Sequence, residues 1–212
     1  MSRIVQRIGT GVCLLLWLSA CGSSPPNNFY RLTPALAPVP GNQEPSLGIG
    51  PVDVPEFLNR NSMVYTRGGN QLQIASTERW AEPLEYGINR VVGLNLSALM
   101  RTENLRFFPW DVRQAPDYGV RISVLDLDAR EAEATLIVDW LIYKPADGTH
   151  LTRQISEFRQ PLASGQLEPA DLPAAYSALF YQFSEAIAAA IKAEMQRGTG
   201  SAGADQQQTG TP

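Results

Sequence analysis

A helical stripe near the C-terminus constrains the fold of this chain most strongly. Large apolar residues recur there at helical spacing, with alanines between them: Leu172, Tyr176, Leu179, Phe180, Phe183, Ile187 and Ile191. Side chains three and four positions apart share one face of a helix. Such a face has to be buried against another layer of secondary structure. We therefore expect a long helix that docks on a β-sheet.

The segments before this helix supply the strands of that sheet. Residues 120–124 alternate apolar and polar side chains, and residues 134–142 and 151–158 continue a strand-like pattern. Pro145-Ala146-Asp147-Gly148 is a turn signal between the last two. Because the connections are short, these three segments predict an antiparallel meander.

The first half of the chain adds three strands and a second helix. Residues 47–54 predict one strand, and residues 63–67 and 72–75 flank Gly68-Gly69-Asn70, which predicts a hairpin. Apolar residues at helical spacing over 83–99, with Pro83 at the start, predict a helix. The predicted fold is α+β: a single domain with a mainly antiparallel sheet and two main helices packed on one face.

The N-terminus has the parts of an export signal. Arg3 and Arg7 precede a short apolar run over residues 12–18, which is far below the ~20 residues that span a bilayer. The sequence Leu18-Ser19-Ala20-Cys21 then resembles the bacterial lipobox, in which the cysteine thiol receives a diacylglyceryl group before cleavage. We expect Cys21 to be lipidated, with palmitate-like acyl chains that anchor the mature protein firmly.

This processing limits the chemistry of the mature chain. Cys13 would leave with the signal, so Cys21 would be the sole cysteine and its thiol would be blocked. An intramolecular disulfide and a catalytic thiol are therefore excluded. Removing Arg3 and Arg7 leaves 15 of 17 basic residues against 21 acidic ones, a net charge of −6. Such a chain is a poor binder of nucleic acid.

Composition divides the chain into four parts. Residues 1–20 are the lipoprotein signal peptide, and residues 21–45 are a lipidated N-terminus and proline-rich tether. Residues 46–196 form the α+β domain. Residues 197–212 are rich in Gly, Ala, Gln and Thr, and we predict a disordered tail there.

A search for catalytic motifs returns no constellation. His150 is the sole histidine and reads as a solvated strand-end residue, and no G-x-S-x-G elbow is present. Gly48-Ile49-Gly50 lacks the rest of a phosphate-binding pattern. The acids from Asp126 to Glu133 are interpreted as a polar hairpin end. We expect no enzyme activity, no metal site and no cofactor.

Two aromatic segments stand out. Trp80 lies between Arg79 and Glu82, directly before the first predicted helix, and Trp110 follows Phe107-Phe108-Pro109 after that helix. Either tryptophan could cap the core or present a surface to a partner. For both, the structural interpretation is favoured over the binding one.

Several blocks together resemble the PqiC (YmbA) family of auxiliary lipoproteins of ABC-type transport systems. The resemblance runs from Cys21 to about Lys192, and residues 33–46 and the C-terminal tail depart from it. The blocks are Tyr30-Arg31-Leu32, residues 48–60, residues 79–84, Asn95-Leu96, Pro109-Trp110 and the strand containing Trp140. The residues in them that we expect to serve partner binding or structure are Pro55, Arg60, Arg79, Trp80, Pro83, Leu84 and Trp110.

The resemblance implies an α+β domain anchored by its acyl chains in the outer membrane and facing the periplasm. Gly22-Ser23-Ser24 after the cysteine, in place of an aspartate, agrees with that membrane by analogy. The implied partners are an MCE-domain channel protein and the inner-membrane permease of the same lipid transport system. A homo-oligomeric ring would suit the mouth of such a conduit.

Two other functions stay open from the sequence. One is a periplasmic lipid-binding carrier, which would need an apolar cavity. The other, weaker one is an envelope hydrolase that uses His150 or the acids near residues 126–133.

Overall fold

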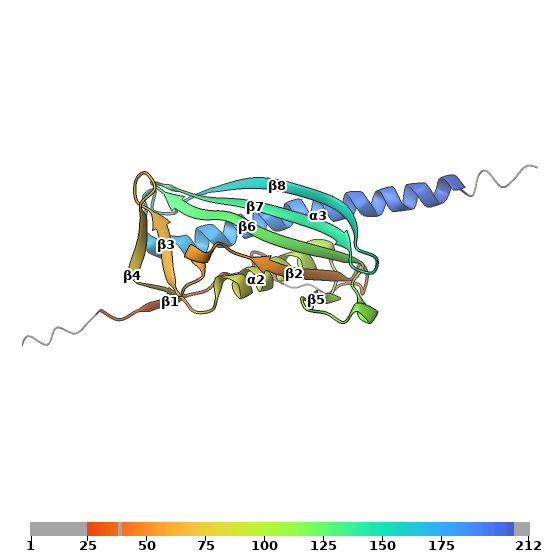
Figure 1. Ribbon diagram of the computed structural model, residues 1–212, viewed down its shortest axis with the longest axis horizontal. Helices are drawn as coiled ribbons and strands as arrows, with labels where there is room; N and C mark the ends of the chain where they lie inside the picture. The colour runs from red at the N-terminus through yellow and green to blue at the C-terminus, as the bar shows by residue number, and fades with distance from the viewer. Residues whose placement is uncertain (1–24, 38–39, 206–212) are drawn as a thin grey trace, which may run out of the picture.

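The computed structural model describes residues 25–37 and 40–205. These residues form a five-stranded sheet, a three-stranded sheet and two long helices (Figure 1). The larger sheet has the order β5-β2-β6-β7-β8, and the smaller one has the order β1-β4-β3. The described residues thus form a single α+β domain, as predicted.

The strands of the larger sheet are β2 (Leu47–Asp53), β5 (Leu105–Phe107), β6 (Tyr118–Arg130), β7 (Glu133–Lys144) and β8 (Thr149–Pro161). Those of the smaller sheet are β1 (Asn28–Tyr30), β3 (Ser62–Thr66) and β4 (Leu72–Trp80). The long helices are α2 (Leu84–Met100) and α3 (Leu172–Asp205). Three short 3-10 helices complete the structure: η1 (Glu56–Leu58), η2 (Val112–Gln114) and η3 (Pro169–Asp171).

The predicted antiparallel pairings are confirmed. Strands β6, β7 and β8 form the meander, and β3 and β4 form the hairpin around Gly68-Gly69. The strand-period pattern and the turn residues carried these predictions because both act over a few neighbouring residues.

The sheets differ from the prediction in their parallel pairings. Strand β2 lies between β5 and β6 and is parallel to both, and β1 is parallel to β4. Strands β1 and β5 have three residues each and were not predicted. Such short segments carry no measurable periodicity, so distant parts of the chain decide their pairing.

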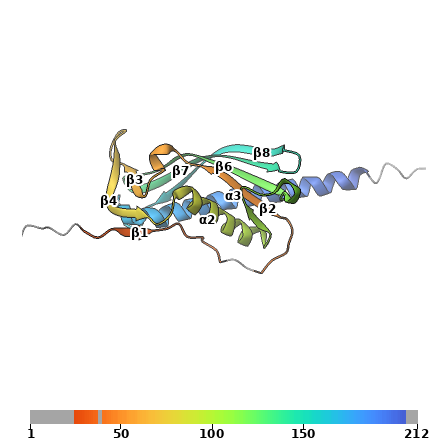
Figure 2. The ribbon, with the colours of Figure 1, turned by 60° about the horizontal axis from the view of Figure 1, so that its bottom comes forward.

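Both helices cover the same face of the larger sheet (Figures 1 and 2). Helix α3 packs on β7 and β8, α2 packs on β2, and the two helices contact each other. All seven residues of the predicted C-terminal stripe are buried. Phe183 from this stripe lies edge-on to Trp140 of β7, with ring centroids 6.0 Å apart and the planes at 72°. The predicted docking of this helix is confirmed.

Helix α3 continues past the predicted domain boundary at residue 196 and ends at Asp205, beyond the end of the sheet (Figure 1). Once a helix is nucleated, each further residue adds a hydrogen bond at little cost, so weak helix formers can extend it. The remainder of the predicted tail, residues 206–212, lies outside the described residues.

Candidate functional site

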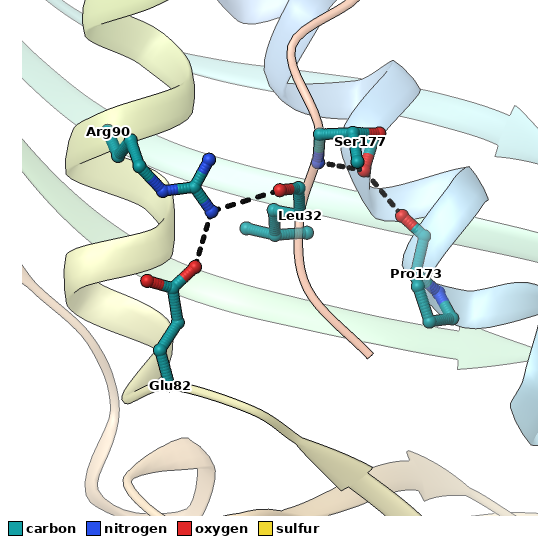
Figure 3. Close-up of polar contacts among 6 residues, drawn as sticks. Leu32, Glu82, Arg90, Pro173 and Ser177 are labelled. Atoms are coloured by element: carbon teal, nitrogen blue, oxygen red, sulfur yellow. Dashed lines mark hydrogen bonds and ion pairs between the residues drawn. The ribbon is translucent and has the colours of Figure 1, made fainter. Parts of the chain in front are cut away.

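The segment predicted as part of a tether is docked on the domain from Asn28 onward. We call residues 28–37 the strap, because it runs between the two helices (Figure 3). Leu32 is fully buried between α2 and α3. The backbone N–H of Thr33 donates to Ser177 Oγ at 3.1 Å, and the Ser177 hydroxyl donates to the carbonyl of Pro173 at 2.6 Å.

Helix α2 holds the strap from its other side. The guanidinium of Arg90 donates to the carbonyl of Leu32 at 3.1 Å and forms an ion pair with Glu82. The backbone N–H of Ala35 donates to Asn95 Oδ1 at 3.0 Å, and Asn95 is fully buried. These partners satisfy strap backbone groups that would otherwise be buried without hydrogen bonds. The strap is therefore fixed on the domain, with Leu32 in the core and most of its other side chains exposed.

The sequence block at residues 79–84 forms one wall of this arrangement. The backbone N–H of Ala81 donates to the carbonyl of Tyr30 at 2.7 Å, and Tyr30 pairs with Trp80 across β1 and β4. Glu82 supplies the carboxylate that orients Arg90. We call residues 79–84, Arg90, Asn95 and Ser177 the clamp. Its common property is contact with the strap or with its immediate partners.

Trp80, Pro83 and Leu84 lie inside the domain. Trp80 is buried and stacks on Tyr176 of α3, with ring centroids 6.2 Å apart. Pro83 directly precedes α2, where its missing N–H costs nothing. Leu84 opens the buried face of that helix. All three join the smaller sheet to the helices.

Arg79 stabilises an irregular part of β4. Its guanidinium donates to the hydroxyl of Ser62, to the carbonyl of Ala75 at 3.1 Å and to the carbonyl of Ser76 at 3.0 Å. The pairing register of β3 and β4 shifts at this point. Arg79 thus closes a bulge by binding backbone carbonyls, and no carboxylate is involved.

Pro55 and Arg60 lie on the connection from β2 to β3. The carbonyl of Pro55 accepts a hydrogen bond from the N–H of Leu58 at 2.9 Å and so opens η1. The side chain of Arg60 is exposed. The next residue, Asn61, accepts a hydrogen bond from the backbone N–H of Trp80 at 2.6 Å. This connection therefore reaches the clamp through its backbone.

Trp110 lies away from the clamp, in what we call the aromatic loop (residues 107–110). Its ring covers Gly48 so closely that a Cβ at Gly48 would lie 2.9 Å from the indole. Phe108 meets Trp110 edge-on at 5.5 Å between ring centroids. Phe107 and Phe108 are exposed by 43% and 48%. The loop begins at the last residue of β5, a strand that lies toward the end of the larger sheet opposite to β1 (Figure 1).

The groups considered for catalysis serve other purposes. His150 is exposed on β8. No group of three or more His, Cys, Asp or Glu side chains suited to a metal occurs among the residues that the structure describes. Burial, and then the neighbouring Asp128, raises the pKa of Asp126.

Asp128 corrects the interpretation of the acids as a polar hairpin end. It lies within β6 and is buried, because β3 packs over the end of that strand. Its carboxylate accepts a hydrogen bond from the N–H of Thr66 at 2.8 Å and pairs with Arg130 at 2.8 Å. Asp128 thus links the two sheets. Glu131 does lie in the turn between β6 and β7, as expected.

The hydroxyl of Tyr176 is buried and has no hydrogen-bond partner among the described residues. Burial raises the pKa of this hydroxyl most, and the negative charges of Asp128 and Asp126 raise it further. We expect Tyr176→Phe to raise the free energy of unfolding by about 1 kcal/mol, because it removes an unsatisfied buried group and keeps the ring. Urea unfolding measures this change.

Tyr181→Phe on the same helix is the matched control, since the Tyr181 hydroxyl is bonded to Glu185. It should leave stability unchanged or slightly lower. A loss of stability in Tyr176→Phe would show that its hydroxyl has a partner, such as an internal water, and would contradict the expectation.

Sequence reasoning found only part of the clamp. Leu32 and Asn95 belong to the blocks that resemble the family, whereas Arg90 and Ser177 were not singled out. Ser177 stands out in the sequence only as a hydroxyl within an alanine-rich helix. Serine is also common on the exposed faces of helices, so this signal does not identify a buried contact. The lipobox, Cys21 and the signal peptide lie outside the described residues. Within residues 25–37 and 40–205, no helix has the length and apolar content to cross a membrane.

Comparison with solved structures supports the fold. Protein XCC0632 from Xanthomonas campestris aligns with a TM-score of 0.63 and 14% identity, over 80% of this chain and 99% of that chain. A second, uncharacterized protein aligns with a TM-score of 0.62 and 18% identity, over 79% and 99% of the two chains. At these identities the likeness concerns the fold alone.

Comparison of sequences supports the family. Curated relatives from Escherichia coli (strain K12) and Shigella flexneri, both named intermembrane transport lipoprotein PqiC, are 31% identical over 88 residues. The match covers 39% of this chain and 46% of each relative, so it spans about half of their length. The model of a family described as ABC-type transport auxiliary lipoprotein component matches residues 30–188, which include the clamp, the aromatic loop and the strap from Tyr30 onward. The protein therefore belongs to the family of ABC-type transport auxiliary lipoprotein components.

Proposed function

We propose that this protein is a non-catalytic accessory subunit of an MCE/ABC-type intermembrane lipid transport system. It is held in the outer membrane by the acyl chains of Cys21, faces the periplasm and docks the MCE-domain channel component there. The permease of the same system lies in the inner membrane. The family match and the name of the relatives support the transport role.

The clamped strap carries the docking proposal. A subunit that positions a channel needs a stiff connection between its membrane anchor and its body. Leu32 is buried between two helices, and Arg90 and Ser177 bind the strap backbone from both sides. Only a short segment separates Cys21 from the start of this clamped region at Asn28. The position of the anchor is thus passed to the whole domain.

The carrier alternative is less well supported by the described residues. A carrier needs an enclosed apolar cavity that takes up an acyl chain. A hollow of about 820 Å³ beside β6 and β7 is open to solvent and includes Asp117 and Lys144 in its wall. Its polar lining suits water better than an acyl chain. We therefore propose docking as the function.

The aromatic loop is the surface that we assign to the channel component. It lies toward the end of the larger sheet opposite to β1, on the side away from the membrane anchor (Figure 1). Exposed aromatic side chains are frequent anchors of protein interfaces. Gly48 and Gly93 seat the loop through close contacts with Trp110 and Phe107.

Co-purification of the full-length, detergent-solubilised lipoprotein tests the docking function. We expect the wild-type protein to recover the MCE-domain channel protein, and Phe108→Ser to reduce recovery at least tenfold. Leu125→Ser is the matched control, because Leu125 is exposed by 47% against 48% for Phe108 and lies on β6 instead. Control and wild type should recover equal amounts.

Recovery of the wild-type lipoprotein alone, under conditions that keep other envelope complexes intact, would contradict the docking function. Equal recovery by Phe108→Ser and wild type would move the contact away from the aromatic loop and leave the docking function standing.

A further inference from the structure

The smaller sheet forms the end of the molecule at which the chain arrives from Cys21. Strands β1, β3 and β4 lie together there (Figures 1 and 2). Three large apolar side chains are exposed on it: Phe29 of β1 by 66%, and Leu72 and Ile74 of β4 by 46% each. We call these three residues, together with Arg31 and Arg67, the anchor-end surface.

Two arginines accompany the apolar side chains. Arg31 follows Phe29 by two positions, and Arg67 precedes the turn into β4. Both are exposed, and within the described parts of the chain neither has an ion-pair partner, whereas six other arginines do. This leaves two guanidinium groups beside apolar side chains without a directly paired carboxylate, with Glu131 and Glu168 lining the same hollow as Arg67. The combination suits the headgroup region of a bilayer that contains anionic lipids.

Chain length restricts how far this surface can be from lipid. Phe29 is eight residues from Cys21, a span of at most about 26–29 Å when fully extended. The clamp holds the strap on the domain. Residues of the strap therefore cannot detach to lengthen the segment between Cys21 and the smaller sheet. Tethering at this range gives an effective concentration in the millimolar range. A contact too weak to recruit a free protein would then be occupied most of the time.

We propose that the anchor-end surface rests on the lipid surface of the membrane that holds Cys21, with Phe29, Leu72 and Ile74 in the interfacial layer and Arg31 and Arg67 at lipid phosphates. The proposal rests on the acylation of Cys21. The long axis of the domain then stands away from the membrane, which directs the aromatic loop into the periplasm.

Site-directed spin labelling tests this contact. The acylated thiol of Cys21 does not react, so cysteines introduced in the full-length lipoprotein by Phe29→Cys, Leu72→Cys or Ile74→Cys are the only labelled sites. Ile155→Cys is the control, because Ile155 is exposed by 68% on β8. The labelled proteins are reconstituted in vesicles of phosphatidylethanolamine and phosphatidylglycerol.

The measurement is the collision rate of each nitroxide with oxygen and with a water-soluble nickel complex. At positions 29, 72 and 74 we expect vesicles to lower the nickel collision rate several-fold and to raise that of oxygen. Position 155 should stay as accessible as in the unacylated protein that carries both Cys13→Ser and Cys21→Ser. Adding Arg31→Gln and Arg67→Gln should reduce the protection, as should high salt.

Equal accessibility at positions 72, 74 and 155 on vesicles would overturn the proposal. Protection that is already present without vesicles would assign the surface to a second copy of the chain and would also overturn it. Neither result bears on co-purification of the channel component, so failure of this contact is distinguishable from failure of the proposed function.

Discussion

Leu32→Ala is expected to lower the free energy of unfolding by about 2–5 kcal/mol, the usual cost of truncating a fully buried leucine. Leu32 fills the space between α2 and α3, which cannot close around the smaller side chain while Arg90 and Ser177 hold the strap backbone. Urea unfolding followed by tryptophan fluorescence measures the change. Hydrogen exchange at the amides of Thr33 and Ala35 should accelerate in parallel, because both amides are bonded to the clamp.

Leu72→Ala is the matched control for this prediction, since it truncates the same side chain at an exposed position. Its effect on the free energy of unfolding should stay within about 0.5 kcal/mol. If Leu32→Ala and Leu72→Ala have equal effects, or if exchange at the two strap amides stays slow, the strap is not held as we describe. The docking role would then lose its structural support.

Gly48→Ala is expected to lower the free energy of unfolding by about 1–3 kcal/mol and to displace the aromatic loop. A Cβ at this position would lie 2.5 Å from Cγ of Pro116 and 2.9 Å from the indole of Trp110. Neither ring can move aside by a simple rotamer change, so the backbone or the loop has to shift. Recovery of the channel component in co-purification should therefore fall along with stability.

Gly198→Ala is the control for added methyl groups, because a Cβ there meets nothing within 4 Å on α3. It should be neutral, or stabilise the helix by up to about 1 kcal/mol. If Gly48→Ala keeps the stability of the wild type and recovers as much channel component, Trp110 does not pack closely on Gly48 of β2. In that case the aromatic loop would be adaptable, and its place in docking would need another explanation.

The elements that could be predicted from the sequence are those with a local cause. The stripe from Leu172 to Ile191 predicted α3 because its burial depends on helical spacing alone. Gly68-Gly69 predicted the hairpin of β3 and β4, since positive φ at both glycines determines the turn. The candidate residues Trp80, Pro83 and Leu84 were singled out for the same reason: they mark a helix start.

The elements that could not be predicted depend on distant partners. Strands β1 and β5 are three residues long, and each exists because a strand elsewhere in the chain offers it a parallel edge. Asp128 was predicted to belong to a polar hairpin end because it precedes a turn, and only the packing of β3 over β6 buries it. The strap was read as a tether because Pro34 and its neighbours suggested an open chain.

The sequence by itself determined the two helices with their buried faces and the antiparallel strands joined by short turns. These follow from the order of residues within a short window, which sets charge, periodicity and turn geometry. The tertiary structure alone decided that the strap is docked on the domain through Leu32. Leu32, Arg90 and Ser177 lie far apart in the chain, and only the packing of α2 beside α3 brings them together to hold the strap. Every residue except proline has the same backbone carbonyl and N–H, so the sequence pattern does not predict which distant side chains will bond to them.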